Sequence, residues 1–184
     1  MVRIRARWNA KNRKQTPEDM GGVLAVNAWK IAGELLLHLE NEDFQVDTHS
    51  QRLDILEEVM IFLVHLADRM VYGKLDDERR AAVIRAMAIR AAELFQENRE
   101  ELYGPGQYKQ PFIDKLNQRV QEYAEYPADE DGPGFAMSRC LGRHVADRVG
   151  ERHRKWVGDQ IIDIEVPEML PPFRKAVKMM LDRE

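Results

Sequence analysis

The chain contains a short phrase twice, and each copy places a histidine and an aspartate where they could bind a metal or move a proton. His-Leu-Ala-Asp-Arg begins at His65, and His-Val-Ala-Asp-Arg begins at His144. On a helix, residues three apart share a face, so His65 lies above Asp68 and His144 above Asp147, about 4.5 Å apart along the axis. Two such helices packed face to face would bring both pairs together. The repeat also predicts an internal duplication of a helix hairpin.

Two further carboxylates precede the two phrases, each on a helix of its own. Glu34 lies on the helix expected before the first phrase, and Glu122 lies near the end of the helix expected before the second. Imidazole and carboxylate groups bind Fe, Mn and Zn in proteins. The candidate ligands of a divalent metal are therefore His65, Asp68, His144, Asp147, Glu34 and Glu122. No Gly-rich phosphate loop occurs, and no organic cofactor is implied.

In the number and order of these groups, the chain resembles the dimetal-carboxylate, ferritin-like helical bundles. In that family one Glu comes from each of two helices, and a carboxylate–histidine pair three residues apart comes from each of the other two. The pair is reversed here, His-x-x-Asp in place of Glu-x-x-His, and its carboxylate is shorter. What the resemblance implies for this chain is metal binding within a bundle, without the family's metal geometry or oxygen chemistry.

The same residues also allow an interpretation without a metal. Asp68 can pair with Arg148, and Asp147 with Arg69, across a contact between the two helices, because neighbouring residues point about 100° apart on one helix. Each histidine then donates to a carboxylate or a backbone carbonyl. Two hypotheses from different classes follow. One is a metal-binding protein or metalloenzyme, and the other is a non-catalytic interaction protein in which these side chains form a structural network between helices.

The single cysteine of the chain lies one helical turn before the second histidine. Cys140 and His144 are four residues apart, so their side chains can meet on one helix face. A buried helical cysteine is, however, more often a core residue. One cysteine cannot form an intramolecular disulfide, which predicts a reducing, cytoplasmic location.

The composition is typical of a folded helical protein. Hydrophobic residues make up 44% of the 184 residues, which argues against disorder, and the abundant Ala, Leu, Glu, Arg and Met favour helices. The net charge of −4 gives no general case for nucleic acid. No uninterrupted apolar run approaches the ~18 residues of a membrane span, and no apolar stretch follows the basic N-terminus. Neither a membrane partner nor a secretory signal is therefore expected.

The N-terminal segment differs from the rest in charge. Six basic residues and no acidic one precede Glu18, and Trp8 lies among them. Residues 1–15 are predicted to form a flexible basic arm. The arm either binds nucleic acid or an acidic partner, with Trp8 available for stacking, or it lies on the acidic body of the same chain.

Capping residues and apolar periodicity locate the helices of residues 16–184. The expected helices span about 17–39, 49–72, 77–102, 111–125, 135–149 and 172–181. They predict an all-α, single-domain bundle of about six helices, with a four-helix core built from the first, second, fourth and fifth. The last helix carries an apolar stripe at Phe173, Val177 and Met180. That stripe either closes the core or docks on a second subunit to form a homodimer.

Overall fold

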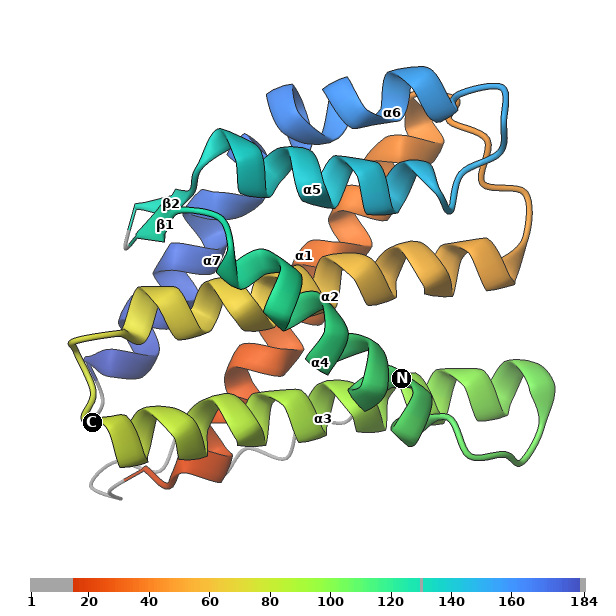
Figure 1. Ribbon diagram of the computed structural model, residues 1–184. Coiled ribbons are helices and arrows are strands. Elements are labelled where there is room, and N and C mark those ends of the chain that lie inside the picture. Colours follow the sequence, from red (N-terminus) through yellow and green to blue (C-terminus); the bar gives the residue numbers. More distant parts are fainter. Residues whose placement is uncertain (1–14, 130, 183–184) are drawn as a thin grey trace.

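The computed structural model describes residues 15–129 and 131–182, and its helices confirm the all-α fold class (Figure 1). The predicted basic arm, residues 1–15, lies outside the described residues except for Gln15. The described part of the chain contains seven α-helices, one π-helical turn and two very short strands. In chain order these are α1 (Pro17–Asn41), α2 (His49–Val71), α3 (Asp77–Tyr103), α4 (Lys109–Ala124), β1 (Ala128–Asp129), β2 (Gly132–Pro133), α5 (Phe135–Ala146), α6 (Arg154–Gln160), η2 (Ile161–Glu165) and α7 (Val166–Leu181).

The first three helices begin where side chains cap their first turn. The Thr16 side chain accepts a hydrogen bond from the backbone N–H of Asp19, and the Asp19 carboxylate accepts one from the N–H of Thr16. Thr48 and Gln51 form the same reciprocal pair at the start of α2. Asp76 caps α3 through its carboxylate. Because these contacts join residues three apart, the sequence alone identified Thr16 and placed the other two caps within one residue, at Asp47 or Thr48 and at Asp76 or Asp77.

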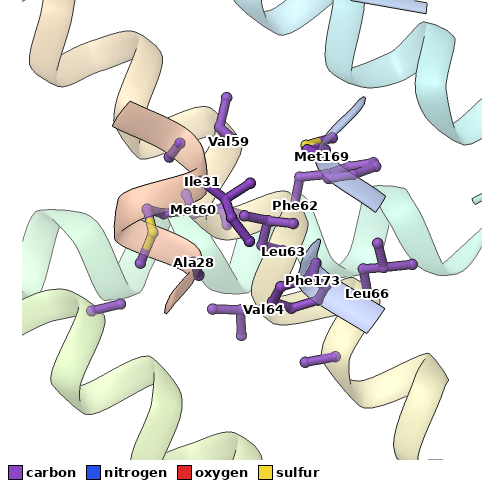
Figure 2. Packing of buried hydrophobic residues seen from close by; sticks show 14 of the residues in the cluster. Ala28, Ile31, Val59, Met60, Phe62, Leu63, Val64, Leu66, Met169 and Phe173 are labelled. Atoms are coloured by element: carbon purple, nitrogen blue, oxygen red, sulfur yellow. The ribbon is translucent and has the colours of Figure 1, made fainter. Parts of the chain in front are cut away.

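Helix α2 runs through the middle of the molecule and packs against α1, α3, α4, α5 and α7 (Figure 1). Every side chain from position 55 to position 67 is buried, so the helix has no solvent face over more than three turns. Figure 2 shows Phe62 and Leu63 of α2 packed beside Ile31 of α1 and Phe173 of α7. A helix that is apolar on most sides must be covered on most sides, which explains its central place.

The core differs from the four-helix unit that the sequence predicted, because α3 and α7 also belong to it. Helix α1 packs along α3 and α7 as well as α2. Val83 and Met87 of α3 are fully buried, and so are Phe173 and Met180 of α7. The apolar stripe of the last helix therefore closes the core of this chain. The role of α3 was missed because its core face is rich in alanine, which packs by close approach and leaves little apolar signal.

The close contact of α1 with α3 predicts that replacing two adjacent glycines with alanine has opposite effects on the free energy of unfolding. A Cβ at Gly21 would lie 2.5 Å from the backbone nitrogen of Met87 and 2.6 Å from the carbonyl oxygen of Val83, whereas a Cβ at Gly22 would meet nothing within 4 Å. We expect Gly21→Ala to lower the free energy of unfolding by about 1–3 kcal/mol through overpacking. Gly22→Ala should raise it by roughly 0.5–1 kcal/mol through helix propensity. Urea unfolding measures both changes in free energy. Changes of the same sign would contradict the close approach of α1 to α3 at Gly21.

Helix α7 begins at Val166, earlier than the predicted start at Pro172, and contains two prolines in its interior. Pro171 and Pro172 have no N–H, so two hydrogen bonds of the helical ladder cannot form. The helix persists because its buried face is continuous, with Met169 and Phe173 packed in the core. Tertiary packing outweighs the local signal here, and reading the prolines as a helix start was wrong.

Helix α1 is long and apolar enough, by length and composition, to cross a bilayer. Its most apolar window has a mean hydropathy of 1.2. The sequence expectation considered only uninterrupted apolar runs, and α1 is interrupted by Asn27 and Lys30. Half of the window is buried inside the fold. Core helices and signal sequences pass the same test, so this segment by itself assigns no location to the protein.

Candidate functional site

Three side chains from α4 and α5 direct a carboxylate, a thiol and an imidazole toward one another. His144 Nε2 lies 2.8 Å from Glu122 Oε2 and 3.5 Å from Cys140 Sγ. One donor atom of each residue lies within 4.8 Å of the donor atoms of the other two. Cys140 and His144 are buried, and Glu122 is half-buried. These three residues are called the Glu-Cys-His cluster below.

The hairpin between α4 and α5 brings the cluster together. Strands β1 and β2 pair antiparallel, with Ala128 opposite Pro133, and they reverse the chain after the last turn of α4 (Figure 1). Cys140 and His144 then lie one turn apart on α5, and both face back toward Glu122. The predicted i, i+4 meeting of the thiol and the imidazole is thus present, with the carboxylate supplied from the preceding helix.

Tyr123, the residue after Glu122, contacts both histidines of the repeated phrase. Its ring centroid lies 5.7 Å from that of His65 and 6.3 Å from that of His144. The ring is fully buried, and the hydroxyl finds no hydrogen-bond partner within the described part of the chain. Burial raises the pKa of Tyr123 well above its ordinary value, and the neighbouring Cys140 adds to the effect. A buried hydroxyl without a partner carries a desolvation cost that a ligand could relieve.

A second carboxylate, Glu58 of α2, is connected to the cluster through an arginine. Glu58 is fully buried and accepts hydrogen bonds from Arg119 at 2.9 and 3.2 Å and from Arg148 at 2.9 Å. Arg119 Nη1 also lies 3.6 Å from Glu122 Oε2. Burial acts to raise the pKa of Glu58, but the hydrogen bonds from both arginines hold it below its ordinary value. Glu58 is therefore a charged residue that joins α2 to α4 and to the segment after α5.

The protonation states within the cluster follow from burial and from the contacts of the three groups with one another. Burial raises the pKa of the Cys140 thiol to about 12, and the hydrogen bond to the Glu122 carboxylate and its charge reinforce this. Burial lowers the pKa of His144, as does the charge of Arg119. Burial acts to raise the pKa of Glu122, but hydrogen bonds from Cys140 and His144 and the charge of Arg143 hold it low. At neutral pH the thiol is protonated, the imidazole neutral and the carboxylate charged.

The geometry does not fit a cysteine nucleophile. In a nucleophilic relay the histidine contacts the nucleophile through one ring nitrogen and the orienting acid through the other. Here Cys140 and Glu122 both approach Nε2 of His144. A reactive cysteine also needs a lowered pKa, and that of Cys140 is raised. The arrangement is one of three donors converging on a common point.

The distances fit a tetrahedral zinc ion with modest rearrangement. Zn–N bonds near 2.0–2.1 Å and Zn–S bonds near 2.3 Å separate the nitrogen from the sulfur by roughly 3.6 Å. The His144–Cys140 separation is 3.5 Å. The Glu122 oxygen would have to withdraw from His144 by a few tenths of an ångström. Thiolate and imidazole ligands select Zn²⁺ over Mg²⁺ or Ca²⁺.

The positive charge of Arg143 disfavours the binding of a cation at the Glu-Cys-His cluster. Its guanidinium contacts the Glu122 carboxylate and lies 3.4 Å from Cys140 Sγ. The side chain of Arg143 is 57% exposed, so it can turn into water when a cation takes its place. Arg119 remains nearby, although its shortest contacts are to Glu58.

Of the six ligands predicted from the sequence, the structure brings two together. These are Glu122 and His144. His65 is buried beside Tyr123, and its Nε2 accepts a hydrogen bond from Arg69 Nε at 3.3 Å. Burial and the charge of Arg69 lower the pKa of His65 to about 4, so it is neutral at pH 7. His65 thus adjoins the cluster through Tyr123 without belonging to it.

The other three predicted ligands lie elsewhere. Asp68 Oδ1 is 3.7 Å from Arg80 Nη1 of α3. Asp147 Oδ1 accepts a hydrogen bond from Arg154 at 2.6 Å, and both side chains are about half exposed. Glu34 is exposed on α1. The cluster therefore replaces the predicted six-ligand set with a smaller one, in which Cys140 is the added member.

The structural network predicted as the alternative forms with different partners. Arg148 binds Glu58, not Asp68. Arg69 binds His65 and the carbonyl oxygen of Ala124, so it is not the partner of Asp147. The predicted ion pairs were wrong because Arg148 reaches Glu58, a fully buried carboxylate of α2, whereas Asp68 lies beside α3.

The lengths of the helices do not support the predicted duplication of a helix hairpin, because α1 and α2 do not match α4 and α5 in length. Helices α1 and α2 have 25 and 23 residues, whereas α4 and α5 have 16 and 12. Both histidines of the repeated phrase do contact Tyr123, as a shared site would require. The duplication stays a prediction.

Comparison with known proteins adds no family to this description. No protein-family model, no curated protein and no solved structure matches the chain. The resemblance to dimetal-carboxylate bundles thus rests on the residue pattern alone, and within the fold only Glu122 and His144 of that pattern meet.

Proposed function

We propose that the protein binds a divalent cation, with Zn²⁺ as the best-matched metal, through Glu122, Cys140 and His144. The observation that carries the proposal is the convergence of three different donor groups within 4.8 Å of one another. Three protein ligands leave one tetrahedral position for water or a substrate, as in catalytic zinc sites. Zinc bound in this way lowers the pKa of its water, so hydrolysis is the reaction class that such a site would serve.

Binding at this site exchanges a proton for the metal. The Cys140 thiol, whose pKa is raised to about 12, must lose its proton to become a ligand. His144 is already neutral at pH 7, because burial lowers its pKa. One proton is therefore released for each zinc bound. At any pH below the thiol pKa, raising the pH by one unit should raise the zinc affinity about tenfold. The thiol proton shared with Glu122 marks the place that the metal would take.

Zinc binding is tested directly with protein purified without chelator or nickel resin. We expect one Zn²⁺ per chain by elemental analysis and by competition with a chromogenic chelator. His144→Ala should weaken binding by at least about 100-fold, since changing a residue that only orients a metal ligand already costs 10–100-fold. His49→Ala removes an exposed histidine of α2 and serves as the matched control. Equal zinc affinity in the two variants would reject the site.

Cobalt gives a second readout that reports on the sulfur ligand. Co²⁺ in the same site should show a thiolate-to-cobalt charge-transfer band, because Cys140 is the only cysteine of the chain. Cys140→Ser should abolish the band while the helical circular dichroism is kept. Retention of the band in this variant, or its absence from the wild type, would count against coordination by Cys140.

A second candidate function is supported by Glu58. Its buried contacts with Arg119 and Arg148 are those of a structural network, as expected for a non-catalytic interaction protein. In that case Glu122 and His144 serve only to join α4 to α5. Wild-type stability that is the same with chelator and with zinc would favour this function over metal binding, since a metal bound only by the folded chain stabilises it.

A further inference from the structure

A groove of about 550 Å³ opens between α2, α3 and α4. These three helices all contact one another, and Figure 1 shows how they are arranged. Most of its lining is apolar, with Ile84 and Ala88 on one side and Ile113 and Leu116 on the other. Its volume lies within the range of small-molecule sites, roughly 300–1,000 Å³. The groove is separate from the Glu-Cys-His cluster and shares none of its three residues.

Polar groups gather at the end of the groove where α2 ends and α3 begins. Asp68 lies in the last turn of α2 and Arg80 in the first turn of α3. Arg85 lies one turn further along α3. His65 also lines the groove and is neutral at pH 7, because burial lowers its pKa. The charged lining residues are thus two arginines and one aspartate, and a second aspartate, Asp77, lies 3.8 Å from Arg80 outside the lining.

Arg80 forms two long ion pairs, and neither carboxylate lies close enough to accept a hydrogen bond from it. Its Nη1 and Nη2 lie 3.7 Å from Asp68 Oδ1 and 3.8 Å from Asp77 Oδ1, distances too long for hydrogen bonds. Its Nε is buried and has no acceptor among residues 15–129 and 131–182. The guanidinium is positioned over the ring of Tyr72, 4.9 Å from the centroid. A buried N–H without an acceptor is unfavourable, and a carboxylate bound directly to the guanidinium would pair with it more closely than the two long ion pairs do.

We propose that this groove binds a small amphipathic carboxylate, with its head group on Arg80 and its apolar chain along α3 toward Ala88. Arg80 and Ala88 are eight residues apart, which is about 12 Å along a helix and suits a medium-chain acid. The apolar walls exclude water from the chain, and the planar guanidinium matches a carboxylate in shape and charge. A cationic head group would meet Arg80 and Arg85, and a neutral one would form no ion pair with either.

The test is titration of the full chain with decanoate, below its micelle concentration, by isothermal calorimetry. Chelator is present throughout, so that a carboxylate bound to zinc cannot contribute. Decanol and decyltrimethylammonium carry the same chain with a neutral and a cationic head group. We expect decanoate to bind at least about tenfold more tightly than either, the usual scale for one charge-assisted pair. Equal affinities for the three compounds would overturn the proposal.

Two variants locate the ligand within the groove. Arg80→Gln should weaken decanoate binding at least tenfold and leave decanol binding unchanged. Arg90→Gln is the matched control, because Arg90 also lies on α3 and forms ion pairs with Glu93 and Glu97 but does not line the groove. The same loss of affinity in both variants would show that the effect is not specific to Arg80, and would overturn the assignment of the head group.

A third variant keeps the proposal testable should the loss of Arg80 impair folding. Ala81 is exposed and lines the groove, so Ala81→Phe fills the space without disturbing the core. We expect this variant to lose binding of both decanoate and decanol while its thermal unfolding stays close to that of the wild type. Unchanged decanoate affinity in Ala81→Phe would place the ligand elsewhere and overturn the proposal.

Discussion

Replacing Glu58 with glutamine is expected to lower the free energy of unfolding by about 3–5 kcal/mol, the cost of removing one partner from a buried ion pair. Glu58 is fully buried and is the acceptor for three hydrogen bonds from Arg119 and Arg148. The neutral amide has a similar shape but removes the buried anion that the two guanidinium groups share. Urea unfolding at pH 7, followed by circular dichroism, measures the change.

A surface ion pair provides the comparison for this loss. Arg52 Nε lies 2.5 Å from Glu40 Oε1, and both side chains are about one-third exposed. Glu40→Gln should therefore change stability by no more than about 1 kcal/mol. Similar losses in Glu40→Gln and Glu58→Gln would mean that burial of Glu58 has no special energetic role. The loss in Glu58→Gln should be the same with chelator and with zinc, because Glu58 is not a member of the Glu-Cys-His cluster.

The pH dependence of the Glu58 contribution follows from its pKa. Hydrogen bonds from the two arginines outweigh the effect of burial and hold the pKa below the ordinary value of 4.5. The stabilisation is present above pH 4.5 and is lost as the pH falls through the lower folded-state pKa. At neutral pH it is fully expressed, so the comparison of variants belongs there.

Local signals account for the parts of the fold that the sequence located correctly. Thr16 and Thr48 mark helix starts because each bonds to a residue three positions away. The continuous apolar run of α2 predicts a central helix for a similar reason, since the pattern alone excludes a solvent face. The start of α7 was missed because prolines suggest a boundary locally, and only the packed core reveals that the helix continues through Pro171 and Pro172.

The candidate site was only partly accessible from the sequence. Cys140 and His144 meet across one helical turn, a distance that spacing reveals. Glu122 could be named as a carboxylate near a helix end, but its approach to His144 depends on the hairpin between α4 and α5. The contact of Glu58 with Arg119 joins residues 61 positions apart and has no local signature. Tertiary packing decides which of several carboxylates is buried.

Replacing His65 with glutamine is expected to remove a large part of the acid sensitivity of the fold. Burial and the charge of Arg69 lower the pKa of His65 to about 4 in the folded protein, against an ordinary value of 6.5. The unfolded chain therefore takes up a proton at a pH where the folded protein keeps the imidazole neutral. This contribution is present above pH 6.5 and is lost as the pH falls from 6.5 to about 4. The shift of the His65 pKa between the unfolded and the folded chain corresponds to about 3 kcal/mol of unfolding free energy.

The decisive quantity is the change in unfolding free energy between pH ~7 and pH ~4, since carboxylates contribute equally in wild type and variant over this range. Glutamine retains an acceptor for the Nε–H of Arg69, which donates to His65 in the wild type. His65→Gln should thus lose about 3 kcal/mol less than the wild type on acidification. His49→Gln changes an exposed histidine on the same helix and should behave as the wild type. If His65→Gln and His49→Gln show the same pH dependence, the buried neutral imidazole is not what makes the fold sensitive to acid.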